Sequence, residues 1–221
     1  MSLIEWLPQF QSGKLRLILG SASSARRKVI EQLGIPIEVM VSDFAEDLDK
    51  SMFEDLTEYP VATSMHKTKD LITKISPGNN AHHTILITCD TVVLREDRHI
   101  MEKPSSKEHA TEMITSLSGK DHIVVTGVVA TLLDNEGSII AQQVFKEIST
   151  VRMAVLSPKQ IESYVCTGEP MGKAGGYGMQ GLGELLIRSV TGSYTNVVGI
   201  PLHSVAKCVG DLLGTHLLND V

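Results

Sequence analysis

The hydrophobic positions of this chain fall into short β-branched runs that alternate with amphipathic segments. An apolar run bounded by turn residues predicts a buried strand, and apolar residues three and four apart predict a helix that packs on it. Strands are expected at residues 15–19, 35–41, 84–88, 122–133 and 138–155, and helices at residues 25–33, 57–75, 105–117, 157–167 and 201–213. Crossover helices and antiparallel hairpins together predict an α/β protein with a mixed sheet.

The chain shows no internal repeat and no long flexible linker. We therefore predict one domain over residues 1–221, with two lobes around a cleft, in which residues 1–14 form an N-terminal extension. That extension lacks the basic start and apolar core of a signal peptide. No apolar run reaches transmembrane length, so we expect a cytoplasmic protein without a membrane partner.

Composition narrows the range of partners. The 221 residues carry a net charge of −6, which argues against broad binding of nucleic acid because that needs a positive face. A local basic pocket for one nucleotide remains compatible with this charge. The three cysteines are widely spaced in apolar surroundings and lack CxxC spacing, which favours reduced, buried thiols and a reducing compartment.

The stretch from Thr84 to Val93 holds the main candidate for chemistry. An apolar run ends at Asp90, and a second apolar run begins directly after it. A carboxylate at the exit of a buried strand is either capped by backbone donors or directed into a cleft. A polar turn follows, and a hairpin there would bring Lys103 back near Asp90.

A loop of small residues, 20–24, precedes the helix expected at residues 25–33. Such a loop exposes backbone N–H groups at the positive end of a helix dipole, which suits a phosphate. Ser21 and Ser23 lie in this loop, and Arg26 and Arg27 stand in the first helical turn. Cations are unfavourable at that end unless an anion binds there. Two solvated surface arginines explain the pattern equally well.

Two further patterns bear on metal binding. Residues 42–55 are acidic and irregular, and Glu46 is one of their carboxylates. Most of these carboxylates are expected to be solvated loop charges, and a metal contact is the alternative for a minority. A turn is expected at residues 76–80, and His82 and His83 beside it have no third ligand at helix or strand spacing.

The glycine-rich segment 168–183 imitates two nucleotide motifs. Its GxGxxG match lacks the preceding strand and the following helix of a dinucleotide-binding fold. Its P-loop match is one residue short and has Ala174 where Ser or Thr would bind magnesium. Gln180 could read a base edge, because its amide both donates and accepts hydrogen bonds. A flexible glycine-rich loop is the alternative.

Separated blocks of this sequence resemble the Maf family of nucleotide pyrophosphatases. The blocks occur in family order and cover nearly the whole chain: residues 19–23 with Arg26 and Arg27, 90–93, 102–104, 117–120 with His122, 173–181, and 192–202. The resemblance implies a twisted mixed sheet flanked by helices, with two lobes around a deep cleft, similar to the inosine triphosphate pyrophosphatases. It also implies hydrolysis of nucleoside triphosphates to monophosphate and pyrophosphate with a divalent metal, Mg²⁺ or else Mn²⁺ or Co²⁺.

Site roles follow from the resemblance position by position. The glycine-rich signature is similar to that of the subgroup acting on dTTP and UTP, which suggests clearance of pyrimidine or modified nucleotides, and a homodimer is expected. The implied roles are Asp90 as proton acceptor and metal ligand, Glu46 as support for metal or water, Ser21, Arg26, Lys67 and Lys103 on the phosphates, and Thr91 and Gln180 on the base.

One departure from the family pattern keeps alternatives open. The family has Pro and Arg where this chain has Ser24 and Ala25, so a motif arginine is missing unless Arg27 replaces it. A nucleotide-binding regulator of cell division with little turnover is therefore the second hypothesis. A nucleic-acid-binding module is a third, disfavoured by the acidic balance.

Overall fold

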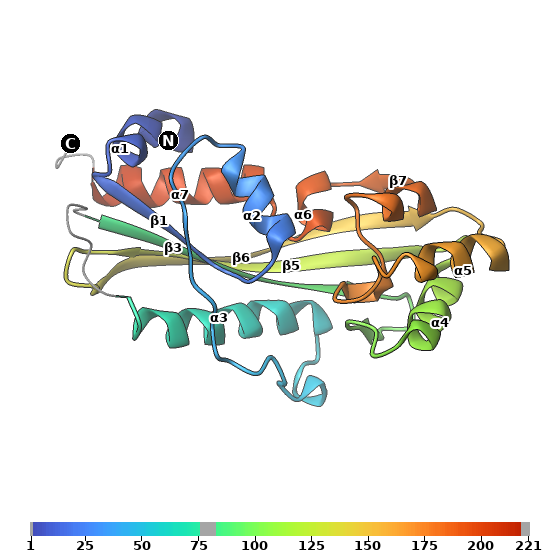
Figure 1. Cartoon of the computed structure of the whole chain (residues 1–221). Coiled ribbons are helices and arrows are strands. Elements are labelled where there is room, and N and C mark those ends of the chain that lie inside the picture. Colours follow the sequence, from blue (N-terminus) through green and yellow to red (C-terminus); the bar gives the residue numbers. More distant parts are fainter. Residues whose placement is uncertain (1, 76–82, 218–221) are drawn as a thin grey trace. The chain divides into compact units, whose positions relative to one another are not determined.

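The protein is described by a computed structural model over residues 2–75 and 83–217 (Figure 1). The turn expected at residues 76–80 and the residue His82 lie outside these ranges. In the described residues, seven strands form one mixed sheet in the order β2-β1-β3-β5-β6-β7, with β4 paired to β3. The strands are β1 (Leu15–Gly20), β2 (Glu38–Val39), β3 (His83–Leu94), β4 (Ile100–Met101), β5 (Asp121–Leu133), β6 (Ile139–Met153) and β7 (Ile187–Thr191). The mixed sheet predicted from the sequence is confirmed.

Helices occupy the amphipathic segments between the strands. The α-helices are α1 (Leu7–Gln11), α2 (Ser24–Glu31), α3 (Tyr59–Ile72), α4 (Lys107–Leu117), α5 (Pro158–Cys166), α6 (Tyr194–Val198) and α7 (Leu202–His216). Short 3₁₀ helices are η1 (Leu3–Trp6), η2 (Lys50–Met52), η3 (Leu56–Glu58), η4 (Ala174–Gly176) and η5 (Leu182–Leu186). No helix in the described part of the chain is long and apolar enough to cross a membrane.

Local sequence signals explain most boundaries. Ser157 and Gln160 form a reciprocal capping box at α5, with Pro158 in the first helical turn, as expected of that start. The strand expected at residues 35–41 is the main correction, because only two residues of it pair with β1. Both are exposed at the edge of the sheet, and Pro36, two residues before Glu38, has no N–H to donate.

The chain divides into two compact units. The first takes in the residues up to Asp90, 127–146 and those from Ile200 onward, and the second takes in 91–126 and 147–199. Strands β3, β5 and β6 contribute residues to both units. The cleft and the single-domain organisation expected from the sequence stay predictions.

In the first unit, α3 and α7 lie on opposite faces of the sheet (Figure 1). Leu71 of α3 packs with Ile18 of β1 and Leu86 of β3, and all three are fully buried. The helix comes so close to the sheet that two glycines are needed beneath it. A Cβ on Gly20 would stand 2.6 Å from the Leu71 side chain, and a Cβ on Gly127 would stand 2.4 Å from the Pro60 backbone.

The second unit has its own core. Residues of α4, α5, β5 and the glycine-rich segment pack together there, among them Ile114, Val124, Ile161 and Tyr177. The β3–β4 hairpin is present in this unit, with Val93 opposite Met101. The hairpin expected after Asp90 is therefore confirmed, and Lys103 follows two residues beyond that pair.

Candidate active site

The carboxyl end of β1 lies beside the part of β3 that carries Asp90. The strand expected at residues 84–88 is longer than predicted, because β3 continues through Asp90 to Leu94, so Asp90 lies within the strand and not at its exit. The strands are parallel, and Gly20 is the register partner of Thr88. Ser21 is the next residue after Gly20, and Asp90 is two residues beyond Thr88. The small-residue loop therefore begins level with this part of β3, close to the carboxylate.

Hydroxyl groups join α3 to β3. The hydroxyls of Thr68 and Thr88 lie 2.5 Å apart, so one donates to the other, and they lie 3.0 and 2.9 Å from the carbonyl oxygen of Ser64, which accepts from the hydroxyl whose proton remains. The Ser64 hydroxyl lies 2.8 Å from the Pro60 carbonyl oxygen and 2.9 Å from that of Gly127. The side chains of residues i and i+2 of a strand point to the same face of the sheet. Because Thr88 contacts α3, the Asp90 side chain points toward α3 as well.

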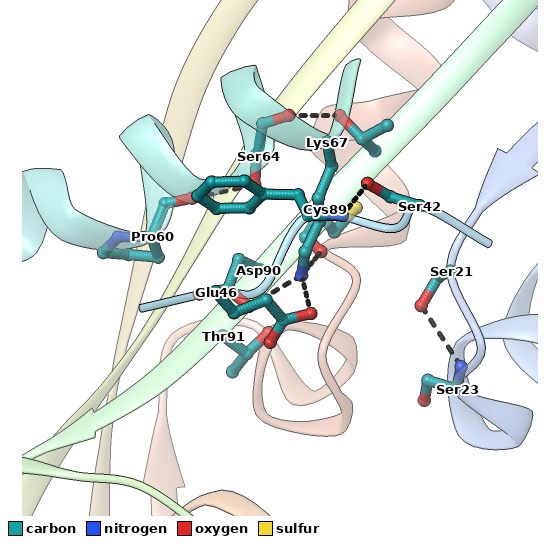
Figure 2. A network of polar contacts seen from close by, with 12 residues as sticks. Ser21, Ser23, Ser42, Glu46, Pro60, Ser64, Lys67, Cys89, Asp90 and Thr91 are labelled. Carbon is teal, nitrogen blue, oxygen red and sulfur yellow. Dashed lines mark hydrogen bonds and ion pairs between the residues drawn. The ribbon is translucent and has the colours of Figure 1, made fainter. Parts of the chain in front are cut away.

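The lysine that the structure places on Asp90 is Lys67, from the middle of α3. Its Nζ lies 3.0 Å from Asp90 Oδ1 and 2.7 Å from Glu46 Oε1, as Figure 2 shows. The Lys67 and Asp90 side chains are 7% and 12% exposed, whereas that of Glu46 is 40% exposed. A buried ammonium needs charged partners, and two carboxylates supply them here.

The loop after β1 forms a second polar cluster. Ser23 caps α2 by accepting a hydrogen bond from the Arg26 backbone N–H at 3.3 Å. The Ser21 hydroxyl accepts from the Ser23 N–H at 3.2 Å, drawn in Figure 2, and from Arg26 Nη1 at 3.0 Å. Arg27 instead pairs with Glu31 on the exposed side of α2, at 2.7 Å. The two adjacent arginines thus have different surroundings, and only Arg26 faces the loop.

Electrostatics around Cys89 link the two clusters. Burial raises the pKa of the Cys89 thiol to about 11. The charges of Arg26 and Lys67 act to lower that pKa, and the Asp90 charge acts to raise it. Arg26, Lys67 and Asp90 therefore all lie within electrostatic range of Cys89. The thiol stays protonated at neutral pH and is a poor nucleophile.

Three predicted site residues belong to the second unit. The Thr91 hydroxyl lies 2.9 Å from that of Thr126 and 3.4 Å from the Gly199 carbonyl oxygen. Lys103 is exposed, and Gln180 is partly exposed. A joint site of Thr91, Lys103 and Gln180 with the predicted site residues of the first unit stays a prediction. Those residues of the first unit are Ser21, Ser23, Arg26, Glu46, Lys67 and Asp90.

The glycine-rich segment is a packed structure with buried backbone. The Glu169 carboxylate accepts from the backbone N–H groups of Leu182 and Gly183, both at 2.9 Å. The Tyr164 hydroxyl lies 3.1 Å from Glu169 Oε1 and accepts from the Gly178 N–H at 3.2 Å. Residues 175–179 are buried. These bonds set the path of the chain that leads to Gln180 and argue against a loose loop.

Buried polar residues around these clusters were not foreseen from the sequence. His122 Nε2 lies 2.6 Å from the Tyr177 hydroxyl, and burial lowers the pKa of His122 to about 4. For the buried hydroxyl residues of α3 the sequence did hold a signal, because Ser64 and Thr68 lie one turn apart on the apolar face of this helix. Hydroxyls in that position indicate a close helix–sheet contact with hydrogen bonds across it.

The two carboxylates on Lys67 fit a divalent cation that is shared with a substrate. Among residues 2–75 and 83–217, no group of three or more His, Cys, Asp or Glu side chains could hold a metal ion. Mg²⁺, however, commonly binds proteins through one or two carboxylates together with substrate phosphates. Asp90 and Glu46 already converge on one positive group, so their oxygens suit that role.

Comparison with known proteins places the chain in a family. A family model described as "Maf-like protein" matches residues 16–212. A dTTP/UTP pyrophosphatase of Exiguobacterium sibiricum is 38% identical over 191 residues, which cover 86% of this chain and 89% of that protein. One of Ruminiclostridium cellulolyticum is 32% identical over 200 residues, covering 89% of this chain and 95% of that protein.

A longer human relative also matches. It is named a probable bifunctional dTTP/UTP pyrophosphatase/methyltransferase protein and is 36% identical over 200 residues, covering 88% of this chain. The match covers 32% of the human protein, so this chain spans about a third of its length. The family model and the two bacterial relatives each match nearly the whole of this chain, which therefore belongs to the Maf-like protein family.

Proposed function

We propose that this protein hydrolyses a nucleoside triphosphate to its monophosphate and pyrophosphate, with dTTP, UTP or modified pyrimidine nucleotides as substrates. Removing such nucleotides from the pool would be a house-cleaning activity. The observation that carries the proposal is the buried Lys67 ammonium between Asp90 and Glu46, near the end of β1 where the loop with Ser21 and Arg26 begins. The two bacterial relatives are dTTP/UTP pyrophosphatases by name, which supports the substrate class.

The chemistry follows from the charges of the substrate. A triphosphate repels an incoming nucleophile, and Arg26 and Lys67 offset that negative charge. Asp90 accepts a proton from water, whose oxygen forms a bond to the α-phosphorus as the bond to the leaving pyrophosphate breaks. We place Ser21, Ser23 and Lys103 on the phosphates, with Arg27 as a weaker candidate because it pairs with Glu31.

Metal, base and partners complete the proposal. Asp90 and Glu46 would hold Mg²⁺, or else Mn²⁺ or Co²⁺, which when bound supplies positive charge to the phosphate oxygens. Thr91 and Gln180 would select the base. We further propose a cytoplasmic homodimer that binds neither nucleic acid nor membrane.

The test is a substrate panel. Purified protein with Mg²⁺ or Mn²⁺ should release pyrophosphate from dTTP or UTP, detected as phosphate only after inorganic pyrophosphatase is added. Asp90→Asn should lower kcat by about 10²- to 10⁴-fold, the usual contribution of a general base. Asp97→Asn is the matched control, because Asp97 pairs with Arg95 in an exposed turn.

Two results would count against the proposal. Pyrophosphate release from none of the standard and modified nucleotides would overturn the activity, and tight nucleotide binding without turnover would select the regulatory alternative. Full activity of a correctly folded Asp90→Asn variant would remove Asp90 as the base.

A further inference from the structure

The backbone of Glu46 has a conformation that glutamate rarely adopts. Its φ is +57°, and Arg98 is the other non-glycine residue with positive φ in the described residues. Such a conformation is unfavourable for a residue with a Cβ and persists where the surroundings hold it in place. At Glu46, contacts at both the carbonyl and the side chain hold it.

The carbonyl contact comes from Tyr59. The Tyr59 hydroxyl donates to the Glu46 carbonyl oxygen at 3.0 Å, and the side-chain contact is the ion pair with Lys67 at 2.7 Å. Tyr59 is the first residue of α3, and Lys67 lies two turns further along the same helix, roughly 12 Å along its axis. Two residues of α3 thus hold Glu46: Tyr59 at its main-chain carbonyl and Lys67 at its carboxylate.

The Tyr59 ring is itself fixed in place. It is 3% exposed, and the Phe53 ring packs edge-on against it at 5.5 Å between centroids. Lys50 Nζ lies over the Tyr59 ring, 5.2 Å from its centroid, and makes a cation–π contact with it. The segment that follows Glu46 therefore wraps around Tyr59, which leaves the hydroxyl little freedom to move away from the Glu46 carbonyl.

We infer that Tyr59 is a positioning residue that keeps the Glu46 carboxylate on Lys67, the lysine that also pairs with Asp90. Tyr59 does this through the main chain, because its hydroxyl holds the left-handed peptide from which the Glu46 side chain projects. The inference rests on the proposed function for its effect on turnover. Without the hydroxyl, the peptide relaxes toward common backbone angles, and the carboxylate spends less time at the cluster.

Tyr59→Phe is the direct test, since it removes the hydroxyl and keeps the ring. We expect kcat to fall about two- to tenfold, the range that one neutral hydrogen bond carries, with KM for the nucleotide nearly unchanged. Tyr194→Phe makes the same chemical change at an exposed tyrosine and should leave both constants unaltered. A smaller folded fraction would also lower the apparent kcat at unchanged KM, so the folded fraction of each variant is measured by circular dichroism and kcat is calculated per folded molecule.

A double-mutant cycle shows whether the effect passes through Glu46. In a Glu46→Gln background, Tyr59→Phe should lower kcat no further, because the carboxylate it positions is gone. An equal fall in both backgrounds would overturn the inference, as would an unchanged kcat in Tyr59→Phe.

A measurement without substrate or metal separates this inference from the proposed function. Hydrogen exchange of the amides at residues 44–48 should be faster in Tyr59→Phe than in the wild type, with Tyr194→Phe unchanged. Equal exchange would overturn the inference even if the wild type hydrolyses nucleotides. Faster exchange in a protein that hydrolyses none would uphold the positioning contact and overturn the activity alone.

Discussion

Replacing Lys67 with methionine should destabilise the first unit. Methionine keeps the length and apolar stem of the side chain and removes the ammonium. Asp90 would then be a carboxylate with a 12% exposed side chain that faces a second carboxylate, Glu46. Removing one partner of a buried ion pair costs about 3–5 kcal/mol. Because Glu46 is 40% exposed and keeps much of its hydration, we expect about 2–3 kcal/mol.

The expected loss is large enough to measure by denaturation. For a chain of this size it corresponds to a fall of roughly 5–10 °C in Tm. Urea unfolding followed by circular dichroism at pH 7 gives the free energy directly. Lys69→Met is the matched control, because Lys69 is exposed on the same helix, and it should change the free energy by less than about 0.5 kcal/mol. Equal stability of the Lys67→Met and Lys69→Met variants would refute the argument.

Two other predictions concern the arginine pair and the buried histidine. Arg26→Ala should raise KM for the nucleotide about tenfold or more, the value of a hydrogen bond to a charged group. Arg27→Ala should raise KM much less, because Arg27 pairs with Glu31, and equal effects in steady-state kinetics would contradict the different surroundings of the two residues. Burial lowers the pKa of His122 to about 4, below its ordinary value of 6.5, so the unfolded chain binds a proton that the folded chain excludes. The contribution of His122 to the free energy of unfolding is complete above pH 6.5, and about 3 kcal/mol of it is lost as the pH falls toward 4. His122→Gln should therefore flatten the plot of that free energy, measured by urea unfolding, against pH in this range. An unchanged slope would show that His122 is not its source.

Asp90 was predictable because its signal is local. An apolar run that ends on a carboxylate is visible in one stretch of sequence, and the β3–β4 hairpin follows from the turn beside it. The phosphate loop was visible for the same reason, since Ser23 caps the helix that begins directly after it. What the local pattern left open was which of the two adjacent arginines faces the loop. Both occupy the first turn of α2, and only the fold separates their directions.

Lys67 was different, because nothing near it in the sequence marks it as buried. On the pattern alone it is one of several polar residues of an amphipathic helix. Its burial depends on how closely α3 approaches the sheet, and that approach is made possible by Gly127, which contacts Ser64 across 63 positions of sequence. Family resemblance identified Lys67 as a site residue, but the partner carboxylates came from tertiary packing.

The contact between α3 and β3 explains why the lysine points where it does. An apolar helix–sheet interface tolerates small rotations of the helix, because dispersion contacts have little directional preference. Here the hydroxyls of Thr68 and Thr88 and the Ser64 carbonyl form directional bonds that such a rotation would break. Each bond adds only about 1 kcal/mol to stability. Their larger effect is on geometry, since Lys67 directly precedes Thr68 and takes its direction from the rotation of the helix that these bonds set.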